Sequence, residues 1–455
     1  MKNILFYFVF VSCVSFGQNK SILYDFAGLP QNLMLNPGAA ANFKFHIGIP
    51  LVSGFSAEVG SSNFVLSDLF LNDNIDFTNK FNVVLNRLSA RDHIKINTQI
   101  EILNGGFRLN DKTYLSFGFY EEFDAISYYP KDVAILLNEG NSAYLNRSFS
   151  LSQLQFKADL VGVLHAGISR EINEKFTIGG RFKIYSGTFN AKTTNNTGTF
   201  TTVSGKNTIY THYLNSININ IETSGISNKG ERLDDTSNLI ENTFLNGNFG
   251  LGLDAGFTYK ISKQLEVSGS ILDFGFINHS KNVANYTAKG NFIFDGVNFK
   301  YDAANATDYW GNIDEAFKEQ LPYEENYDSY ISWRPTKING ALKYSFGEQR
   351  SRYCYDNTYK DFYNSAVGFH LFTIFRPLSP QVALTGFYER ALSKKIFTKF
   401  TYTIDDYSFS NFGAGLSAQL GPFNIYGTAG NLLEFVNLAD AKNISFQFGL
   451  NLIFS

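Results

Sequence analysis

The chain has 455 residues, of which 16% are aromatic and only 17% are charged, whereas a soluble domain carries about 25% charged residues. The formal net charge is −3, so nothing points to nucleic acid as a partner. The aromatic excess, together with 38 glycines, is typical of a β-protein that faces lipid and carries aromatic girdles.

The first seventeen residues have the features of an export signal. Lys2 precedes an apolar run from Ile4 to Val14, and the small residues Ser15 and Gly17 follow it. Small residues at these positions indicate cleavage by signal peptidase. The prediction is therefore a signal peptide over residues 1–17, followed by an exported chain.

The two cysteines restrict the chemistry of the exported chain. Cys13 leaves a lipoprotein alternative open, although the residues before it make a poor lipobox. If cleavage follows Gly17, Cys354 is the only remaining cysteine, which excludes internal disulfides and cysteine-based metal sites. No later run of about 18 apolar residues predicts a transmembrane helix.

Residues 18–42 precede the first strand as a turn-rich, weakly apolar segment, and a plug in the mouth of a barrel is one role for it. From residue 43 to 455, short stretches with an apolar residue at every second position recur, as in strands with one apolar face. The last stretch is the most regular, with Ile444, Phe446, Phe448, Leu450, Leu452 and Phe454 on one face. The predicted strands are 43–59, 94–106, 115–119, 154–169, 176–185, 249–259, 265–271, 338–346, 367–375, 382–388, 396–404, 412–420, 423–425 and 444–454.

The connections between these strands alternate in length. Short turns are predicted at 110–112, 173–175, 262–264, 391–395 and 420–422, and long connections at 61–92, 130–150, 281–328 and 431–442. Bacterial barrels place short turns in the periplasm and long loops outside. This rule makes the patch at 198–222 an external hairpin and gives about 14 crossings, an even count. It also makes 347–364 a long periplasmic connection.

Several local features accompany this prediction. Gly105 and Gly106 are expected to form a β-bulge, and short helices are expected at 80–88 and 131–137. A soluble sandwich is the alternative architecture, but its strands average about 5–6 residues, and those predicted at 154–171 and 176–188 are far longer. The fold class is therefore an all-β, antiparallel, up-and-down transmembrane barrel with long extracellular loops.

Catalytic motifs are almost absent. None of the six histidines has metal-binding spacing, and no nucleophile elbow or phosphate loop occurs. No catalytic residue, metal or cofactor is predicted. A hydrolase whose residues lie in the loops is only a remote alternative.

Polar side chains on the face of the strands opposite the apolar one are predicted to line the lumen. They form a conduit or ligand site, or else they satisfy one another inside a plugged lumen, which is the favoured interpretation because any barrel has inward polar residues. Asp273 stands on a face that is apolar up to Ile271, which predicts a bulge and an exit of the strand from the membrane; a structural role is favoured over a ligand role. The lumen-facing candidates are Lys157, Asp159, His165, Arg181, Lys183, Asp254, Lys337, Asn339, Lys343 and Lys399.

A set of short motifs resembles an uncharacterised family of Bacteroidota outer-membrane barrels, a domain of unknown function. The resemblance covers nearly the whole exported chain and implies a fold and a membrane, without an established activity or catalytic residues. This family is similar in layout to fatty-acid-transporter-like barrels and to PorP/SprF-type barrels of the gliding and type 9 secretion machinery. The motifs are Asn36-Pro37, the strand from Phe45 to Leu51, Tyr129-Pro130-Lys131-Asp132, 271–277, Pro335-Thr336-Lys337-Ile338-Asn339, Leu420-Gly421-Pro422-Phe423 and 440–454.

Three functions follow as hypotheses for a protein of the cell outer membrane surrounded by its lipid. The first is a structural or accessory barrel that binds other envelope proteins, through its external loops or through 347–364. The second is a transporter or channel for a small apolar solute, with the segment before residue 43 as its plug. The third is the loop-borne hydrolase.

Overall fold

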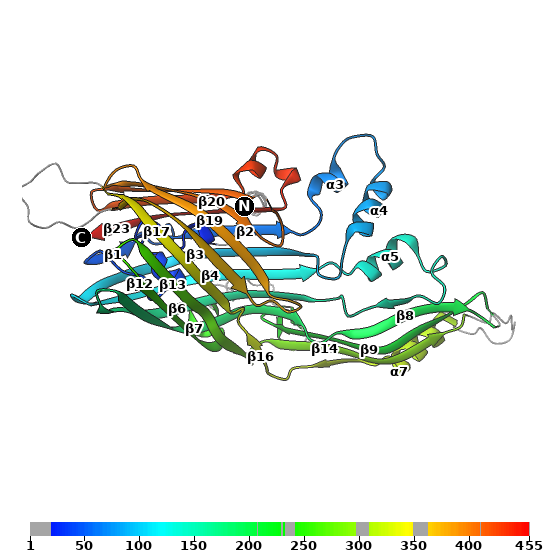
Figure 1. Ribbon diagram of the computed structural model, residues 1–455. Helices are drawn as coiled ribbons and strands as arrows, with labels where there is room; N and C mark the ends of the chain where they lie inside the picture. Colours follow the sequence, from blue (N-terminus) through cyan, green and yellow to red (C-terminus); the bar gives the residue numbers. More distant parts are fainter. Residues whose placement is uncertain are drawn as a thin grey trace, which may run out of the picture.

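A computed structural model describes residues 20–206, 208–228, 231–232, 242–296, 309–348, 363–409 and 411–454. They form a closed antiparallel β-barrel with fourteen wall strands (Figure 1). β1 and β2 together make the first crossing, and they pair with β3 on one side and with β23 on the other, which closes the wall. The wall consists of β1 (Phe45–Gly48), β2 (Phe55–Ser61), β3 (His93–Asn110), β4 (Thr113–Tyr128), β6 (Phe156–Asn173), β7 (Phe176–Thr193), β12 (Asn248–Lys260), β13 (Leu265–His279), β17 (Lys337–Glu348), β18 (Tyr363–Ile374), β19 (Gln381–Ala391), β20 (Ile396–Ile404), β21 (Asn411–Leu420), β22 (Phe423–Gly430) and β23 (Asn443–Phe454).

The alternation of side chains gives the wall two different faces. On β6, Leu164 and Ile168 are exposed on the outside, whereas Asp159 and His165 are buried on the inside. Successive side chains of a strand point to opposite faces, so one sequence pattern places an apolar band outside and a polar lining within. The fourteen-strand barrel predicted from this alternation is confirmed.

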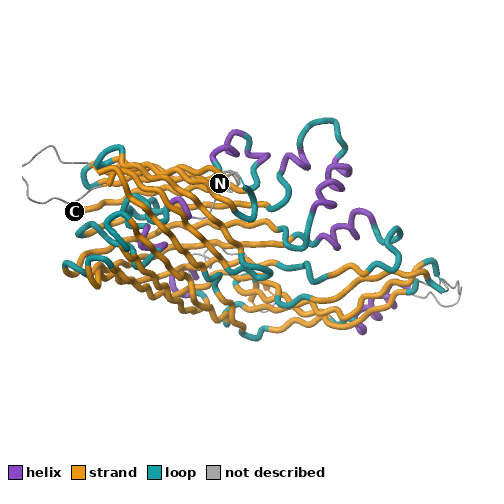
Figure 2. Tube along the Cα trace, in the orientation of Figure 1, coloured by secondary structure: helices purple, strands orange, loops and turns teal. Residues whose placement is uncertain are grey.

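The two ends of the barrel differ, as Figure 2 shows by its loops and helices. The tight turns after β3, β6, β12, β19 and β21 all lie at one end, which we call the short-turn end. The opposite end, the long-connection end, carries most of the helices (Figure 1). No helix among the described residues is long and apolar enough to span a membrane. The helices outside the lumen are α3 (Leu66–Phe70), α4 (Phe77–Arg87), α5 (Lys131–Glu139), α7 (Tyr309–Gln320), η2 (Asn242–Asn246), η3 (Leu432–Val436) and η4 (Leu438–Asp440).

At the long-connection end a sheet continues well beyond the wall (Figure 1). The predicted hairpin at 198–222 is present as β8 and β9, and β9 pairs with β7 and β14. Residues 281–328 belong to a long connection between two wall strands, as predicted, but the expectation that they form only a loop is wrong. Weak alternation in the sequence hid a strand at Val283–Phe294, which is stabilised by pairing with β9. The strands of this extension are β5 (Ser148–Ser150), β8 (Thr197–Ser204), β9 (Tyr210–Ser224), β14 (Val283–Phe294), β15 (Tyr323–Asn326) and β16 (Tyr330–Trp333), and a separate small hairpin is formed by β10 (Ser227–Asn228) and β11 (Glu231–Arg232).

The β-bulge predicted at Gly105 and Gly106 is not there, and β3 has its bulges at other positions. Gly105 and Gly106 pair regularly with β4, whereas the register of β3 shifts between Glu101 and Leu103 and again near Arg108. The glycines serve close packing instead, since a Cβ at Gly106 would lie 2.5 Å from a backbone carbonyl oxygen of β4. The predicted signal peptide at 1–17, both cysteines and most of 347–364 lie outside the described residues.

Candidate functional site

The inner face of the wall carries all ten polar residues that the sequence singles out. Seven of them are buried, and Lys157, Lys337 and Lys343 are largely buried. Most belong to ion pairs, whereas Asn339 donates a hydrogen bond to Ser270 at 3.0 Å and lies 3.0 Å from a ring nitrogen of His370. They lie on β6 (Lys157, Asp159, His165), β7 (Arg181, Lys183), β12 (Asp254), β17 (Lys337, Asn339, Lys343) and β20 (Lys399).

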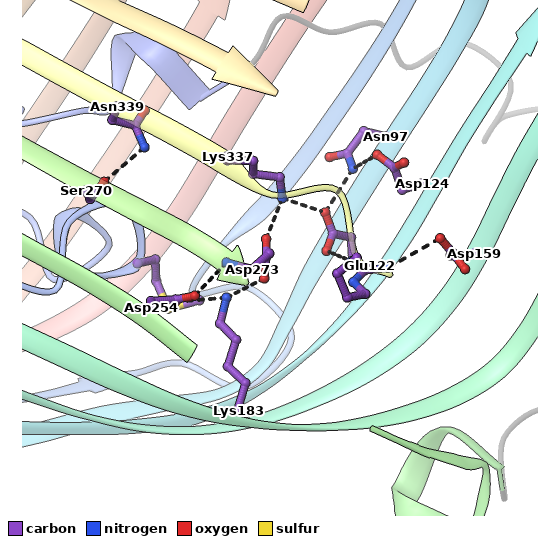
Figure 3. A network of polar contacts seen from close by, with 12 residues as sticks. Asn97, Glu122, Asp124, Asp159, Lys183, Asp254, Ser270, Asp273, Lys337 and Asn339 are labelled. Atoms are coloured by element: carbon purple, nitrogen blue, oxygen red, sulfur yellow. Dashed lines mark hydrogen bonds and ion pairs between the residues drawn. The ribbon is translucent and has the colours of Figure 1, made fainter. Parts of the chain in front are cut away.

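Asp273 is the hub of the largest ion-pair network (Figure 3). One carboxylate oxygen of Asp273 lies 2.5 Å from Lys183 Nζ, and the other lies 2.8 Å from Lys337 Nζ. Lys183 also contacts Asp254 at 2.9 Å, and Lys337 also contacts Glu122 at 3.2 Å. The hub therefore joins strands β4, β7, β12, β13 and β17 through buried charges.

A β-bulge puts Asp273 in this position. The register between β12 and β13 shifts so that Leu272 and Asp273 together oppose Asp254. Asp273 adopts a left-handed backbone with φ 58°, which aspartate and asparagine tolerate better than most residues. Its N–H donates to the Asp254 carboxylate at 2.7 Å. The predicted bulge is confirmed, and beyond it β13 remains paired with β12 as far as Ile277.

The network continues to Arg334, which follows β16 and precedes Pro335. Arg334 contacts Glu122 at 2.6 Å and Asp159 at 3.6 Å. Lys157 approaches the same Asp159 at 3.6 Å. Because a buried charge is costly unless it is paired, this mutual satisfaction accounts for so many charged groups inside one lumen.

A second cluster of charges lies nearer the short-turn end. Lys343 contacts Glu389 at 2.9 Å and Asp25 at 3.2 Å, and Lys399 contacts the same Glu389 at 2.9 Å. Asp25 belongs to the N-terminal segment and not to the wall. This cluster therefore connects the wall of the barrel to a separate piece of chain within it.

Residues 20–43, which we call the plug, fold inside the barrel as η1 (Lys20–Ile22), α2 (Asn32–Leu35) and the turns around them. Their apolar side chains pack in two buried clusters against tyrosines of the inner wall. Leu23, Phe26 and Leu29 pack against Tyr426. Leu33, Ala41 and Phe43 pack against Tyr114.

The wall also binds the backbone of the plug. Gly179 of β7 allows the closest approach, since a Cβ added there would lie 1.9 Å from the carbonyl oxygen of Pro37. Basic and hydroxyl side chains of the wall donate to plug carbonyl oxygens, which satisfies groups that have no strand partner. These donors and acceptors are Lys399 to Tyr24 at 2.7 Å, Lys343 to Asp25 at 3.2 Å, Arg181 to Met34 at 3.2 Å, Ser270 to Leu35 at 2.6 Å and Ser169 to Ala39 at 2.9 Å.

Two of the cavities next to the plug differ about tenfold in volume. The larger, of about 610 Å³, is at the short-turn end, because the turn residues Ser262 and Lys394 line it together with Tyr24 and Phe26 of the plug. The smaller, of about 60 Å³, is bounded by Met34 and the Asp273 network. Among the described residues, no group of His, Cys, Asp and Glu is arranged to hold a metal ion.

Sequence reasoning missed several members of these clusters. Glu122 and Asp124 follow Tyr120 at alternate positions on the inward face of β4, and extending that strand beyond residue 119 would have found them. Arg376 lies just after β18 and pairs with Asp124, with one contact at 3.0 Å. Its role has no local signal, because its partner is 252 residues away in the chain.

The chain can be compared with protein families, with curated proteins and with solved structures. The model of a family of unknown function, DUF5723, matches residues 37–430. No curated protein matches the chain. The barrel is similar to the toluene transporter TbuX of Ralstonia pickettii, with 8% identity, 94% of each chain covered and a TM-score of 0.42.

Two further solved structures are similar to the chain at a comparably low level. A FadL homologue of Pseudomonas aeruginosa has 8% identity over 94% of this chain and 95% of that chain, with a TM-score of 0.41. The translocator domain of the autotransporter NalP from Neisseria meningitidis has 8% identity over 91% of this chain and 89% of that chain, with a TM-score of 0.34. Similarities this low give no argument about what the chain binds, so its function has to be argued from its own residues.

Proposed function

We propose, for a chain that belongs to the family of unknown function DUF5723, that it is an outer-membrane channel which its own N-terminal plug holds closed. The observation that carries this proposal is the plug itself. Residues 20–43 lie across the lumen, yet only noncovalent contacts to the wall are described for them. A barrel built only for rigidity has no need of a separate segment that divides its lumen.

The 610 Å³ cavity indicates the kind of solute. Its size lies within the range of about 300–1,000 Å³ that is usual for small-molecule sites. Tyr24, Phe26 and Phe397 offer apolar surface in it, and Lys343 and Glu389 offer charged groups. We expect a small, mainly apolar solute with one polar group, which enters this cavity and passes when the plug moves.

Two adjacent glycines of β7 provide a matched test of the plug. In Gly179→Ala the new methyl group collides with Pro37 and should displace the plug, whereas at Gly180 an added Cβ is 3.7 Å from its nearest neighbour. In planar bilayers we expect brief, rare openings for the wild-type protein and for Gly180→Ala, and frequent openings for Gly179→Ala. Deletion of residues 20–42 should give a lasting conductance.

Folding has to be checked beside conductance, by the heat-modifiable migration that folded barrels show on gels. A deletion variant that is folded and inserted but does not conduct would contradict the proposal and favour a sealed barrel. A wild-type protein with a lasting conductance would show that the plug does not close the lumen.

Orientation in the membrane can be tested on cells. Short turns face the periplasm in bacterial barrels, so an epitope tag at Gly205, between β8 and β9, should be accessible on intact cells. A tag at Glu174, in the turn between β6 and β7, should become accessible only after the outer membrane is opened. The opposite pattern would invert the barrel.

The extension beyond the wall favours a second function, that of an accessory barrel that binds other envelope proteins. A channel does not require a sheet of β5, β8, β9, β14 and β15 outside its wall. Replacing the hairpin beyond the Phe200–Leu214 pair with a short turn should leave conductance unchanged. If this truncation also removes proteins that copurify with the wild type, the extension is a binding platform.

A further inference from the structure

One apolar residue on the outside of the barrel is covered, although another outward residue of the same strand is exposed. Ile444 has the same parity on β23 as Phe446 and Phe448, yet it is 1% exposed where Phe448 is 43% exposed. Side chains of this parity point outward. Part of the chain must therefore lie over the outer surface of the wall at the long-connection end.

The segment beside this end of β23 is η3. Glu434 of η3 accepts hydrogen bonds from the backbone N–H groups of Lys442 at 2.8 Å and Asn443 at 3.4 Å, directly before Ile444. Asn431, which precedes η3, donates to the carbonyl oxygen of Asn443 at 2.8 Å. Figure 1 draws this connection outside the strands, near the top of the view. These bonds hold η3 against the outside of the barrel.

The exposed surface of η3 is apolar. Its only charged residue is Glu434, whose carboxylate is occupied by the two backbone N–H groups. The other four residues are Leu432, Leu433, Phe435 and Val436, which are 39%, 63%, 40% and 91% exposed. Single exposed apolar residues are ordinary on a protein surface, but a cluster of them indicates an interaction site.

We infer that η3 is a lipid-contacting element that inserts its apolar side chains into the outer leaflet beside the barrel wall. The inference rests on the proposed location of the barrel in the outer membrane. Continuity with the lipid-facing band identifies lipid as the occupant, since η3 packs beside β21, whose outward residue Phe412 is exposed. Phe409, in the connection between β20 and β21, is also exposed at this level, at 79%. Apolar and aromatic side chains at this level of a barrel commonly contact the membrane interface.

A fluorescent probe at single cysteines can test where η3 lies. In the full-length protein with Cys13→Ser and Cys354→Ser, the variants Val436→Cys, Phe448→Cys and Leu137→Cys would carry an environment-sensitive dye. Leu137 is the matched control, because it is 84% exposed on α5, away from the wall. Phe448 is the positive control on the lipid-facing band, and the parent without an added cysteine gives the background labelling.

The labelled proteins are reconstituted in phosphatidylcholine vesicles without a quencher, with a lipid that carries a nitroxide near the headgroup, and with a lipid that carries it deep in the acyl chain. We expect blue-shifted emission and at least twofold stronger quenching at position 436 than at 137. Equal emission and quenching at 436 and 137, with 448 quenched, would overturn the inference while leaving the barrel in the membrane. If the dye at position 448 is not quenched either, the proposed location of the barrel in the membrane is wrong as well.

Discussion

Two wall strands, β23 and β13, begin from the same alternating pattern and end in different structures. β23 pairs with β22 from Ser445 to Leu452 without a shift in register. β13 changes register at Leu272 and Asp273, which both point into the lumen. The regular strand gives the wall an apolar outer surface, whereas the interrupted strand places a carboxylate between two lysines. The difference shows that a break in alternation can mark where a barrel organises its interior.

The largest expected effect is that of removing the charge from the interrupted strand. Asp273→Asn keeps a residue that tolerates positive φ but takes a carboxylate away from Lys183 and Lys337. Breaking a buried ion pair costs roughly 3–5 kcal/mol. A destabilisation at the lower end of this range is expected, because both lysines keep another acidic partner. Urea unfolding in detergent, followed by gel migration, measures the change.

The control for this variant is Asp111→Asn, in the exposed turn after β3. It removes the same charge without touching the network and should leave the unfolding midpoint unchanged. If the midpoint of Asp273→Asn equals that of wild type, the hub does not stabilise the barrel and β13 differs from β23 only in shape.

A smaller effect is expected from a charge placed on the regular strand. Phe448 is exposed on the outside of β23 and its neighbour Gln447 is buried inside. A basic residue at a lipid-facing midplane costs roughly 2–4 kcal/mol, and an acidic one less. Phe448→Asp should therefore lower the folded yield in lipid vesicles clearly more than Gln447→Asn, which keeps a neutral amide on the inner face. Equal yields for the two neighbours would refute the assignment of faces.

The strands were predictable from the sequence because a period of two residues is a local signal. The strands and the bulge at Asp273 follow from it, whereas the count of about fourteen crossings and the hairpin at 198–222 follow from the alternating lengths of the connections. The ion-pair partners do not, since Arg334 and Glu122 are 212 residues apart in the chain and meet only after the wall has closed. The strand β14 escaped prediction for a related reason. Its own alternation is weak, and it is stabilised by pairing with β9, which lies in a region rich in Thr, Asn and Ser.

The plug shows the same division between local and distant signals. The segment before residue 43 was expected as a possible plug from its turns and scattered apolar residues. Its seating could not be predicted, because it depends on contacts that exist only in the folded barrel. Gly179 of β7 leaves room for the backbone of Pro37, and Ser270 of β13 donates a hydrogen bond to the carbonyl oxygen of Leu35. The role of the plug in closing a channel stays a prediction until conductance is measured.

The smallest expected effect concerns the coupling within the network. Lys337 bridges Asp273 at 2.8 Å and Glu122 at 3.2 Å. Once Asp273→Asn has removed one acidic partner of Lys337, the change Lys337→Met breaks one ion pair instead of two. The double variant should therefore be less destabilised than the sum of the two single variants. Interacting residues typically show coupling energies of about 0.5–3 kcal/mol, and about 1 kcal/mol is expected because the second partner remains.

The matched cycle on β23 combines Ser445→Ala with Asn451→Ala. Both residues are buried on the inner face, but a rise of about 3.4 Å per residue separates them by roughly 20 Å. Their effects should add within about 0.5 kcal/mol, as for distant sites. Additive effects at Asp273 and Lys337 as well would mean that the ion pairs of β13 act independently. If Asp273 and Lys337 are coupled and Ser445 and Asn451 are not, the bulge at Asp273 is the point at which five strands are held together.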